Sequence, residues 1–344
     1  MLLSVLDQSP IAEGSTGAQA LRNTIDLARL ADRLGYHRYW VSEHHGGPML
    51  AGPSPEALIG PITSATESIR VGSGGVMLPH YSPLKVAESF SLLAGLFADR
   101  IDLALGRAPG TDQLTMFALQ RDRRQAAPDD FPQQLAELLA YLEDDLPEDH
   151  PFRHLARSLP GRPELPVPWL LGSSPQSGIW AAELGLRYAF ADFINGQGST
   201  IVQSYRETFQ PVRDLQAPYT AVGVWVLCAP TDEEAQFLAT STQMSFTMLR
   251  RGQLIAVPSP EKAAAWLQGE GRVAGGSRAG RRTIIGTPET VRAGIEEVAS
   301  EYQADEVIAV TITHDHEARK RSYELLADAM GLQARAPAEA AATA

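Results

Sequence analysis

The stretch YHRYWVSEHHGGP, from Tyr36 to Pro48, places two adjacent histidines where an apolar run ends in a glycine-proline loop. The run from Tyr36 to Ser42 is typical of a strand that is buried on both faces. In barrel enzymes, catalytic groups stand at the carboxyl ends of such strands. Adjacent histidines can bind metal, transfer protons or merely pack, so the residues at the other strand ends must decide between these roles.

Eight short β-rich runs alternate with longer helical patterns, which is the signature of parallel βα units. Eight units in about 250 residues plus insertions predict an α/β fold, a closed (β/α)8 TIM-type barrel, with an open doubly wound sheet as the rival. The predicted strands are Leu2–Leu6, His37–Val41, Ile69–Met77, Ile101–Leu105, Val167–Leu171, Arg187–Phe190, Thr220–Leu227 and Glu306–Ile312. The predicted helices include residues 18–34, 84–97, 177–184, 232–248, 288–302 and 317–330.

The composition indicates one large globular domain. The chain has 344 residues, of which 44% are hydrophobic and 20% charged, enough for one sizeable core. The net charge is −12 and the 29 Lys and Arg residues are scattered, which argues against a nucleic-acid partner. We expect a single domain over residues 1–332 and a disordered Ala- and Pro-rich tail over residues 333–344.

Cysteine content and hydropathy favour a cytoplasmic protein. Cys228 is the only cysteine, so we expect no disulfide framework and no thiolate metal site. The apolar start reaches Asp7 at once and lacks a basic leader, so it predicts a first strand rather than a signal peptide. No run approaches membrane-spanning length, so we expect no membrane partner.

Two segments are much longer than ordinary connections: residues 108–166 after the fourth strand and residues 250–282 after the seventh. Long insertions at strand ends are candidate lids. The second is rich in glycine and arginine between Gly269 and Arg282. It fits either a flexible basic lid or a disordered surface loop.

Three further strand ends point to a ligand. In Val71 to Pro79, three glycines interrupt a strand, which permits either close packing or a flat ligand laid on the backbone. The helix does not follow directly, so this is not a dinucleotide-binding fingerprint. Arg107 is placed to bind a phosphate or to form a surface salt bridge. The serine-rich helix start at Gly172 to Ser177 is either an anion site or ordinary capping.

A metal site at His44 and His45 is not expected, because adjacent residues of an extended strand point to opposite faces and no nearby cluster completes a ligand set. His314 and His316 lie at the same barrel end, where they can share the pocket or stand in a solvated loop. His80 and Tyr81 are also placed to touch a ligand.

Together these segments resemble the bacterial-luciferase-like family of flavin-dependent monooxygenases, over about residues 1–332. The matching stretches are Glu43 to His45, Gly72 to Pro79, Asp99 to Arg107 and Trp169 to Ala182. Within the family, the chain is most similar to short actinobacterial members, including an oxygenase that tailors the aromatic polyketide mensacarcin. The resemblance implies a homodimeric barrel that obtains reduced FMN from a separate flavin reductase.

The reaction that the resemblance implies is oxygenation of an organic small molecule, such as an aromatic polyketide intermediate in antibiotic biosynthesis, through a flavin hydroperoxide. By the same resemblance, His44 is the catalytic histidine, and His45 and Glu43 are its supporting catalytic residues. Gly74-Gly75 matches a non-prolyl cis peptide beneath the flavin ring. The residues assigned to the cofactor are Gly74, Gly75, Met77, Arg107, Ser173, Ser174 and Ser177.

The chain departs from the light-emitting members at two places. Gly106 stands where they carry a reactive thiol, and Gly46-Gly47 replaces bulkier residues after the histidine pair. Both departures leave more room above the flavin, so we expect a larger substrate than a fatty aldehyde. A deazaflavin-dependent dehydrogenase is one alternative, because the basic run from Arg272 to Arg282 suits a polyglutamate tail. A non-catalytic flavin-binding barrel is the other, although His44, the glycine strand and Arg107 argue against it.

Overall fold

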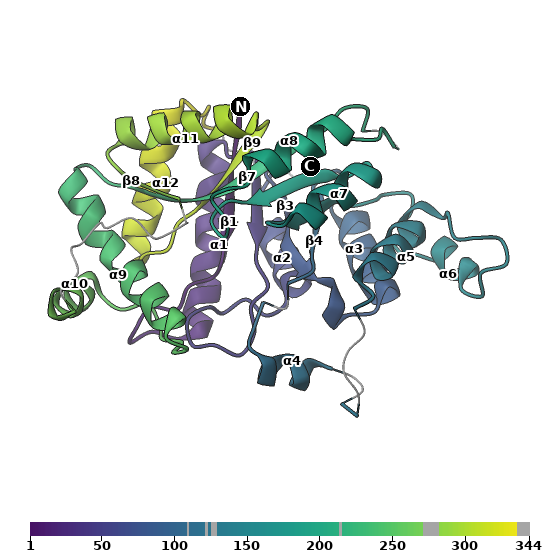
Figure 1. Ribbon diagram of the computed structural model, residues 1–344, viewed down its shortest axis with the longest axis horizontal. Helices are drawn as coiled ribbons and strands as arrows, with labels where there is room; N and C mark the ends of the chain where they lie inside the picture. The colour runs from purple at the N-terminus through teal and green to yellow at the C-terminus, as the bar shows by residue number, and fades with distance from the viewer. Residues whose placement is uncertain (109, 121–122, 125–128, 213–214, 271–281, 336–344) are drawn as a thin grey trace, which may run out of the picture.

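The computed structural model describes residues 1–108, 110–120, 123–124, 129–212, 215–270 and 282–335. At its centre is a closed barrel of eight parallel strands, in which β1 to β7 pair in order and β9 pairs with both β7 and β1. Helices surround this barrel (Figure 1). The predicted TIM-type barrel is confirmed. Its strands are β1 (Leu2–Asp7), β2 (Arg38–Val41), β3 (Arg70–Met77), β4 (Ile101–Gly106), β5 (Val167–Gly172), β6 (Arg187–Ala191), β7 (Thr220–Cys228) and β9 (Glu306–Val310).

A short extra strand, β8 (Thr283–Gly286), lies outside the ring of eight. The long strand β7 pairs with β9 over Ala221–Trp225 and with β8 over Trp225–Cys228. The strand β8 is not predicted from the sequence, because four residues beside a glycine- and arginine-rich run show too little periodicity. The ring itself contains the eight strands that were predicted.

The helices begin and end at the residues that favour such positions. The Thr287 side chain accepts a hydrogen bond from the backbone N–H of Thr290, and Pro288 follows it at the first helical position. The helices are α1 (Gly17–Leu34), α2 (Pro55–Ser64), the 3-10 turn η1 (Leu78–His80), α3 (Pro83–Leu96), α4 (Gln113–Leu119), α5 (Phe131–Glu143), α6 (Arg153–Arg157), α7 (Pro175–Glu183), α8 (Ser199–Thr208), α9 (Asp232–Arg250), α10 (Pro260–Gly269), α11 (Pro288–Tyr302) and α12 (His316–Met330).

The two insertions are partly helical. In the first, α5 packs beside α3 and buries a leucine-rich face, so it is the outer helix that follows β4 in the barrel. Helix α4 stands apart from the ring of helices, at the carboxyl end of the barrel (Figure 1). The second insertion contains α10 and leads to β8. Its glycine-rich part, residues 271–281, lies outside the described residues.

The amino end of the barrel interior is filled by an ionic network. The guanidinium of Arg38 donates to Asp102 Oδ2 at 2.6 Å and to Glu306 Oε1 at 2.7 Å, and Arg70 donates to Asp102 Oδ1 at 2.8 Å. Burial alone raises the pKa of Asp102, but the charges of Arg38 and Arg70 bring it below the ordinary value. The Arg38 guanidinium also lies 4.7 Å from the ring centroid of Trp169. Buried charges require such partners, and this network supplies them for Arg38, Asp102 and Glu306.

The end of the described chain packs on the barrel. Arg335 donates to Asp32 Oδ1 at 2.6 Å and to the Tyr36 carbonyl at 3.0 Å. The packed chain therefore extends to Arg335 rather than stopping at residue 332, and residues 336–344 of the predicted tail lie outside the described residues.

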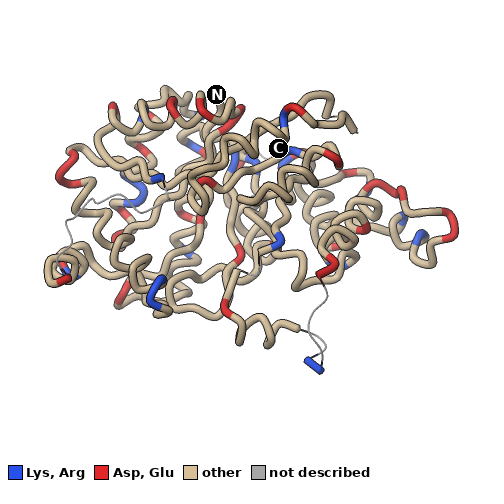
Figure 2. Tube along the Cα trace, in the orientation of Figure 1, with Lys and Arg blue, Asp and Glu red and all other residues tan. Residues whose placement is uncertain are grey.

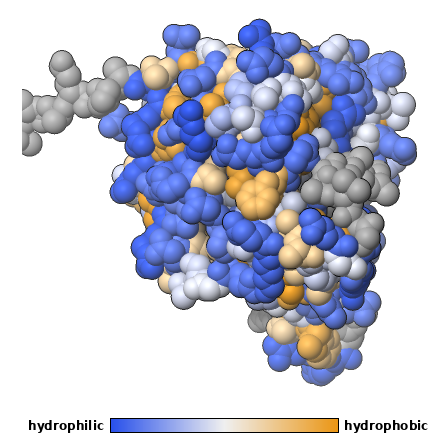
Figure 3. Space-filling model, turned by 90° about the vertical axis from the view of Figure 1, so that its left-hand side faces the viewer, coloured by the Kyte–Doolittle hydropathy of each residue, from blue (hydrophilic) through white to orange (hydrophobic). Residues whose placement is uncertain are grey.

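The surface is polar and mixed in charge. Basic and acidic residues are interspersed along the trace (Figure 2). From the side of α9 and α10, hydrophilic residues cover most of the face and hydrophobic ones form separate patches (Figure 3). In the part of the chain that the structure describes, no helix is both long and apolar enough to cross a membrane.

Candidate active site

The loop after β2 is organised around the fully buried carboxylate of Glu43. Its Oε1 lies 2.7 Å from His45 Nε2, and its Oε2 accepts a hydrogen bond from the backbone N–H of Met77 at 2.9 Å. The Tyr81 side chain is also hydrogen-bonded to this carboxylate. Glu43 therefore joins the ends of β2 and β3 and holds the His45 ring.

His44 occupies a different environment from its neighbour. Its Nδ1 lies 3.0 Å from the Ser42 hydroxyl, and its backbone N–H donates to the Gly52 carbonyl at 2.9 Å. Burial, and secondarily the neighbouring His45, lower the pKa of His44 to about 4. The imidazole is therefore neutral near pH 7.

A pocket of about 490 Å³ opens at the carboxyl ends of the strands, and both histidines line it. Most of its other lining residues are apolar. The lining residues are Gln8, His44, His45, Gly47, Met49, Leu50, Gly110, Thr111, Asp112, Phe193, Ile194, Trp225, Phe246, Leu249, Gly252 and Leu254. The lining found among the described residues contains no Lys or Arg.

One wall of the pocket is aromatic. The Trp225 ring packs edge-on against Phe193 and Phe246, with ring centroids 5.8 Å and 5.0 Å away. The Trp225 indole N–H donates to the Phe193 carbonyl at 3.3 Å, which fixes the indole. Such a rigid wall favours a ligand with an apolar or aromatic ring.

The glycines of β3 stand where the chain leaves no room for a side chain. The peptide bond between Gly74 and Gly75 is cis, as the resemblance implies. A Cβ at Gly74 would lie 2.5 Å from Leu6 Cδ1, and one at Gly75 would lie 2.7 Å from the Ala104 carbonyl oxygen. The pairing of β3 with β4 also shifts between Gly74 and Val76. Close packing therefore accounts for the glycines without a ligand, and a flat ligand on this backbone is compatible with it.

The predicted phosphate-binding residues lie on neighbouring elements. Arg107 is exposed at the end of β4, with its guanidinium 5.8 Å from the ring centroid of Trp180 in α7. Ser174 is the N-cap of α7 and is also exposed. Ser177 is buried, and its hydroxyl is 2.9 Å from the Tyr188 hydroxyl while donating to the Ser174 carbonyl at 2.7 Å. The Ser177 hydroxyl is thus used within the fold, so Arg107 and Ser174 are the exposed side chains among those predicted to bind the phosphate.

The remaining predicted residues take structural positions. The Ser173 carbonyl accepts a hydrogen bond from the Asn195 amide at 3.1 Å. His314 lies 3.2 Å from the Glu13 carbonyl and His316 lies 2.9 Å from Asp26 Oδ2. Neither histidine is among the residues that line the pocket. His314 lies in the loop before α12, whereas His316 is the first residue of α12 and is partly buried beside Asp26.

Sequence reasoning missed the aromatic wall. Trp225 lies in the predicted strand Thr220–Leu227, and alternation along that strand places Trp225 on the same face as Ala221 and Gly223. That alternation was the available signal for Trp225. Phe193 and Phe246 follow no comparable pattern, because Phe193 lies in the loop after β6 and Phe246 lies near the carboxyl end of α9.

The sequence matches the family described as luciferase-like monooxygenase over residues 1–305. This chain belongs to the luciferase-like monooxygenases. It is 46% identical over 333 residues to the uncharacterized protein YwcH of Bacillus subtilis, which covers 95% of this chain and 98% of the relative. It is 37% identical over 328 residues to the N-acetyl-S-alkylcysteine monooxygenase of the same species, with 95% and 98% covered. The family resemblance is therefore confirmed.

Solved structures agree with this family. The crystal structure of apo-MsnO8 superposes with a TM-score of 0.89 at 41% identity, covering 97% of this chain and 99% of that one. The fold alone is shared with the oxygenating constituent of 3,6-diketocamphane monooxygenase of Pseudomonas putida in complex with FMN, at 19% identity and a TM-score of 0.71, with 98% and 100% covered. An F420-dependent secondary alcohol dehydrogenase has the same fold at 13% identity and a TM-score of 0.66, with 95% and 98% covered.

Proposed function

We propose that this luciferase-like monooxygenase uses FMN, obtained in reduced form from a separate flavin reductase, and inserts one oxygen atom of O₂ into an organic substrate. The observation that carries the proposal is the neutral His44 on the wall of a largely apolar pocket at the carboxyl end of the barrel. When bound, reduced FMN supplies the electrons that activate O₂. The family membership and the FMN complex of a protein with the same fold support this choice of cofactor.

The exposed polar residues fit the phosphate of FMN. Arg107 offers a planar guanidinium, which pairs well with phosphate oxygens. Ser174 offers a hydroxyl at the start of α7, where the helix dipole also favours an anion. Because Arg107 contacts Trp180 of α7, the end of β4 lies next to α7, and Arg107 and Ser174 can approach the same phosphate. Gly74, Gly75 and Met77 provide the backbone on which the ring would rest.

His44 is the residue that handles a proton in this proposal. Its lowered pKa keeps the ring neutral at the pH of the cytoplasm, where we expect the enzyme to work. A neutral imidazole accepts a proton from the reacting oxygen and returns it later in the cycle. Ser42 at Nδ1 fixes the ring, and the apolar lining limits the access of water.

The pocket favours a substrate with a flat apolar ring system and no negative charge. Phe193, Trp225 and Phe246 form a rigid aromatic wall, and Asp112 is the carboxylate in the lining. A carboxylate substrate would meet Asp112 without a Lys or Arg among the described lining residues to balance it. We therefore propose a neutral polycyclic aromatic substrate, of the kind produced by polyketide pathways for antibiotics.

The test begins with anaerobic titration of the purified protein with reduced FMN, followed by rapid mixing with O₂. We expect saturable FMN binding, an oxygen-reactive flavin spectrum that differs from free FMN, and oxygenated product from a neutral aromatic substrate. Failure to bind reduced FMN, together with reduction of coenzyme F420 by a secondary alcohol under nitrogen, would replace this proposal by the deazaflavin-dependent dehydrogenase. Binding without turnover of any substrate would leave a non-catalytic flavin carrier.

We also propose that the protein is a homodimer that packs through α2 and α3. Leu92 and Leu96 of α3 are exposed large hydrophobic residues, with exposed fractions of 49% and 66%. Two such leucines on one helix favour burial against a second copy. Sedimentation at micromolar concentration should show twice the chain mass. Leu96→Glu should convert the dimer to a monomer, whereas a monomeric wild-type protein would contradict this assembly.

A further inference from the structure

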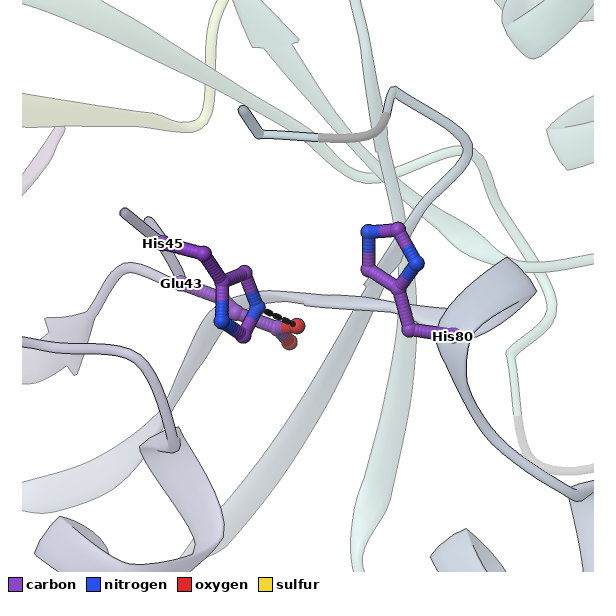
Figure 4. A group of neighbouring side chains, drawn as sticks. All are labelled: Glu43, His45 and His80. Carbon is purple, nitrogen blue, oxygen red and sulfur yellow. Dashed lines mark hydrogen bonds and ion pairs between the residues drawn. The ribbon is translucent and has the colours of Figure 1, made fainter. Parts of the chain in front are cut away.

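Glu43, His45 and His80 come together at the ends of β2 and β3. One ring nitrogen of each histidine and one carboxylate oxygen of Glu43 all lie within 4.8 Å of one another. Figure 4 shows the carboxylate on the side of the His45 ring that faces His80. The two imidazole rings are nearly perpendicular, with centroids 5.6 Å apart. The cluster excludes His44, whose ring faces Ser42 instead.

The three side chains carry donor atoms of the types that transition metals bind. Two imidazoles and one carboxylate are the donors found in three-ligand zinc sites, in which a fourth position stays open. Ligand bonds of about 2.0–2.2 Å place neighbouring donor atoms roughly 3.3 Å apart in a tetrahedron. The three donor atoms already lie within 4.8 Å of one another, so binding an ion requires them to close a gap of at most about 1.5 Å.

The fold also holds the carboxylate in place. Glu43 is fully buried, and its second oxygen is bonded to the backbone N–H of Met77. Such outer contacts orient a ligand before the metal arrives. His80 lies on the 3-10 turn η1, directly after β3, and so approaches from the strand that Glu43 contacts.

We propose that Glu43, His45 and His80 form a binding site for a divalent transition-metal ion of the Zn²⁺ type. Nitrogen donors favour Zn²⁺ and Co²⁺ over Mg²⁺ and Ca²⁺, which require oxygen ligands. Imidazole and carboxylate ligands bind an ion only when they are deprotonated, so metal affinity falls as the pH is lowered. Binding itself does not depend on the proposed oxygenase function.

The consequence for the proposed oxygenase is inhibition. A bound ion holds the His45 ring and places a positive charge at the edge of the pocket. Zinc therefore acts as a reversible inhibitor of oxygenation. This second part of the inference rests on the proposed function, whereas the binding site does not.

The first experiment titrates the full chain with Co²⁺ in the absence of flavin and follows the visible absorption of four- or five-coordinate Co²⁺. We expect one equivalent to bind and Zn²⁺ to displace it. His80→Ala and Glu43→Gln should each weaken Co²⁺ binding at least about tenfold. His154→Ala removes an exposed histidine of α6 and is the matched control, which should bind Co²⁺ as the wild type does.

Circular dichroism establishes that each variant is folded, and His80→Asn replaces His80→Ala if the latter is not. Absence of Co²⁺ absorption in the wild type, or equal absorption in the folded His80 variant, would overturn the metal site. If Co²⁺ binds but Zn²⁺ leaves oxygenation unchanged, the site stands and the inhibition is refuted. If oxygenation is absent even without metal, the proposed function fails and the site is judged by Co²⁺ absorption alone.

Discussion

The two ends of the barrel differ in what fills their interior. At the amino ends of the strands, Arg38 lies between Asp102 and Glu306, whereas the carboxyl ends form the pocket that His44 and Trp225 line. At the amino end, each of the four charged residues of this network, Arg38, Arg70, Asp102 and Glu306, has an oppositely charged partner from another strand. At the carboxyl end, one imidazole of the pair has a carboxylate partner and the other is neutral.

The difference shows how one barrel separates stability from chemistry. The paired charges at the amino end tie β2, β3, β4 and β9 together, so their loss disturbs the whole ring. The residues of the pocket form fewer such ties and are available to a ligand. Changes at the two ends should therefore appear in different measurements.

Asp102→Ala should produce the largest effect, on stability. It leaves the buried guanidinium of Arg38 and that of Arg70 without their shared carboxylate, a change that costs about 3–5 kcal/mol. Urea unfolding measures the loss. Glu296→Ala, which breaks an exposed pair with Arg292, is the control and should cost less than about 1 kcal/mol. Equal losses of unfolding free energy for the two variants would show that the buried network at the amino end does not contribute specially to stability.

His44→Ala should have the opposite effect, a loss of activity with little loss of stability. We expect oxygenation to fall about 10²–10⁴-fold, because a positioned proton-transfer group is lost. The free energy of unfolding should change by no more than about 1 kcal/mol, because the ring is half-buried and has one side-chain hydrogen bond. Steady-state kinetics and urea unfolding test both statements. Unchanged turnover would exclude His44 from the mechanism.

Arg107→Ala should affect the cofactor alone. Loss of a charge-assisted contact to phosphate is expected to weaken FMN binding about 10- to 100-fold. Riboflavin lacks the phosphate and serves as the matched ligand, so its affinity should not change. Fluorescence titration with both flavins measures the difference. An equal loss for both would assign Arg107 to the fold instead.

Trp225→Leu should show a smaller effect, on the substrate. Replacing the central ring of the aromatic wall is expected to weaken binding of a polycyclic aromatic ligand about tenfold. Trp266→Leu, in α10 and in contact with Arg251, is the control outside the pocket. If the two variants bind the aromatic ligand equally well, Trp225 has no part in substrate recognition.

The smallest effect concerns pH. The pKa of His44 is about 4 in the folded protein and near 6.5 when unfolded, so below pH 6.5 the unfolded state binds the additional proton. This residue should therefore lower the free energy of unfolding by about 1 kcal/mol between pH 7.5 and pH 5.5. Comparison of wild type with His44→Gln over this range isolates the contribution. Identical pH dependences would show that the folded protein does not desolvate the His44 ring.

The sequence predicts the barrel well because period and turn residues are local. The eight ring strands and the cap at Thr287 can each be read from a few neighbouring residues. The network of Arg38, Asp102 and Glu306 cannot, because it depends on which residues of distant strands face the interior at the same level. Its partners are separated by as many as 268 positions.

Some residues of the site can likewise be predicted from the sequence, whereas the partners of others cannot. His44 and Glu43 follow directly from the strand that precedes them. The Ser177 hydroxyl looks free in the sequence, but its partner is Tyr188 of the next strand. Likewise, the sequence offers no reason to join His80 to His45, because the meeting of the two rings depends on how η1 turns after β3.

The pairing of β1 with β9 has a consequence for synthesis on the ribosome. Leu2 lies opposite Glu306, so one edge of the first strand waits for a partner made roughly 300 residues later. At about 5–20 residues per second, this interval is roughly 15–60 s. During this time the unpaired edge of β1 is open to other chains, as any exposed strand edge is. Folding in the cell should therefore depend on chaperones that shield nascent chains, and overproduction without them should yield aggregates seeded at β1.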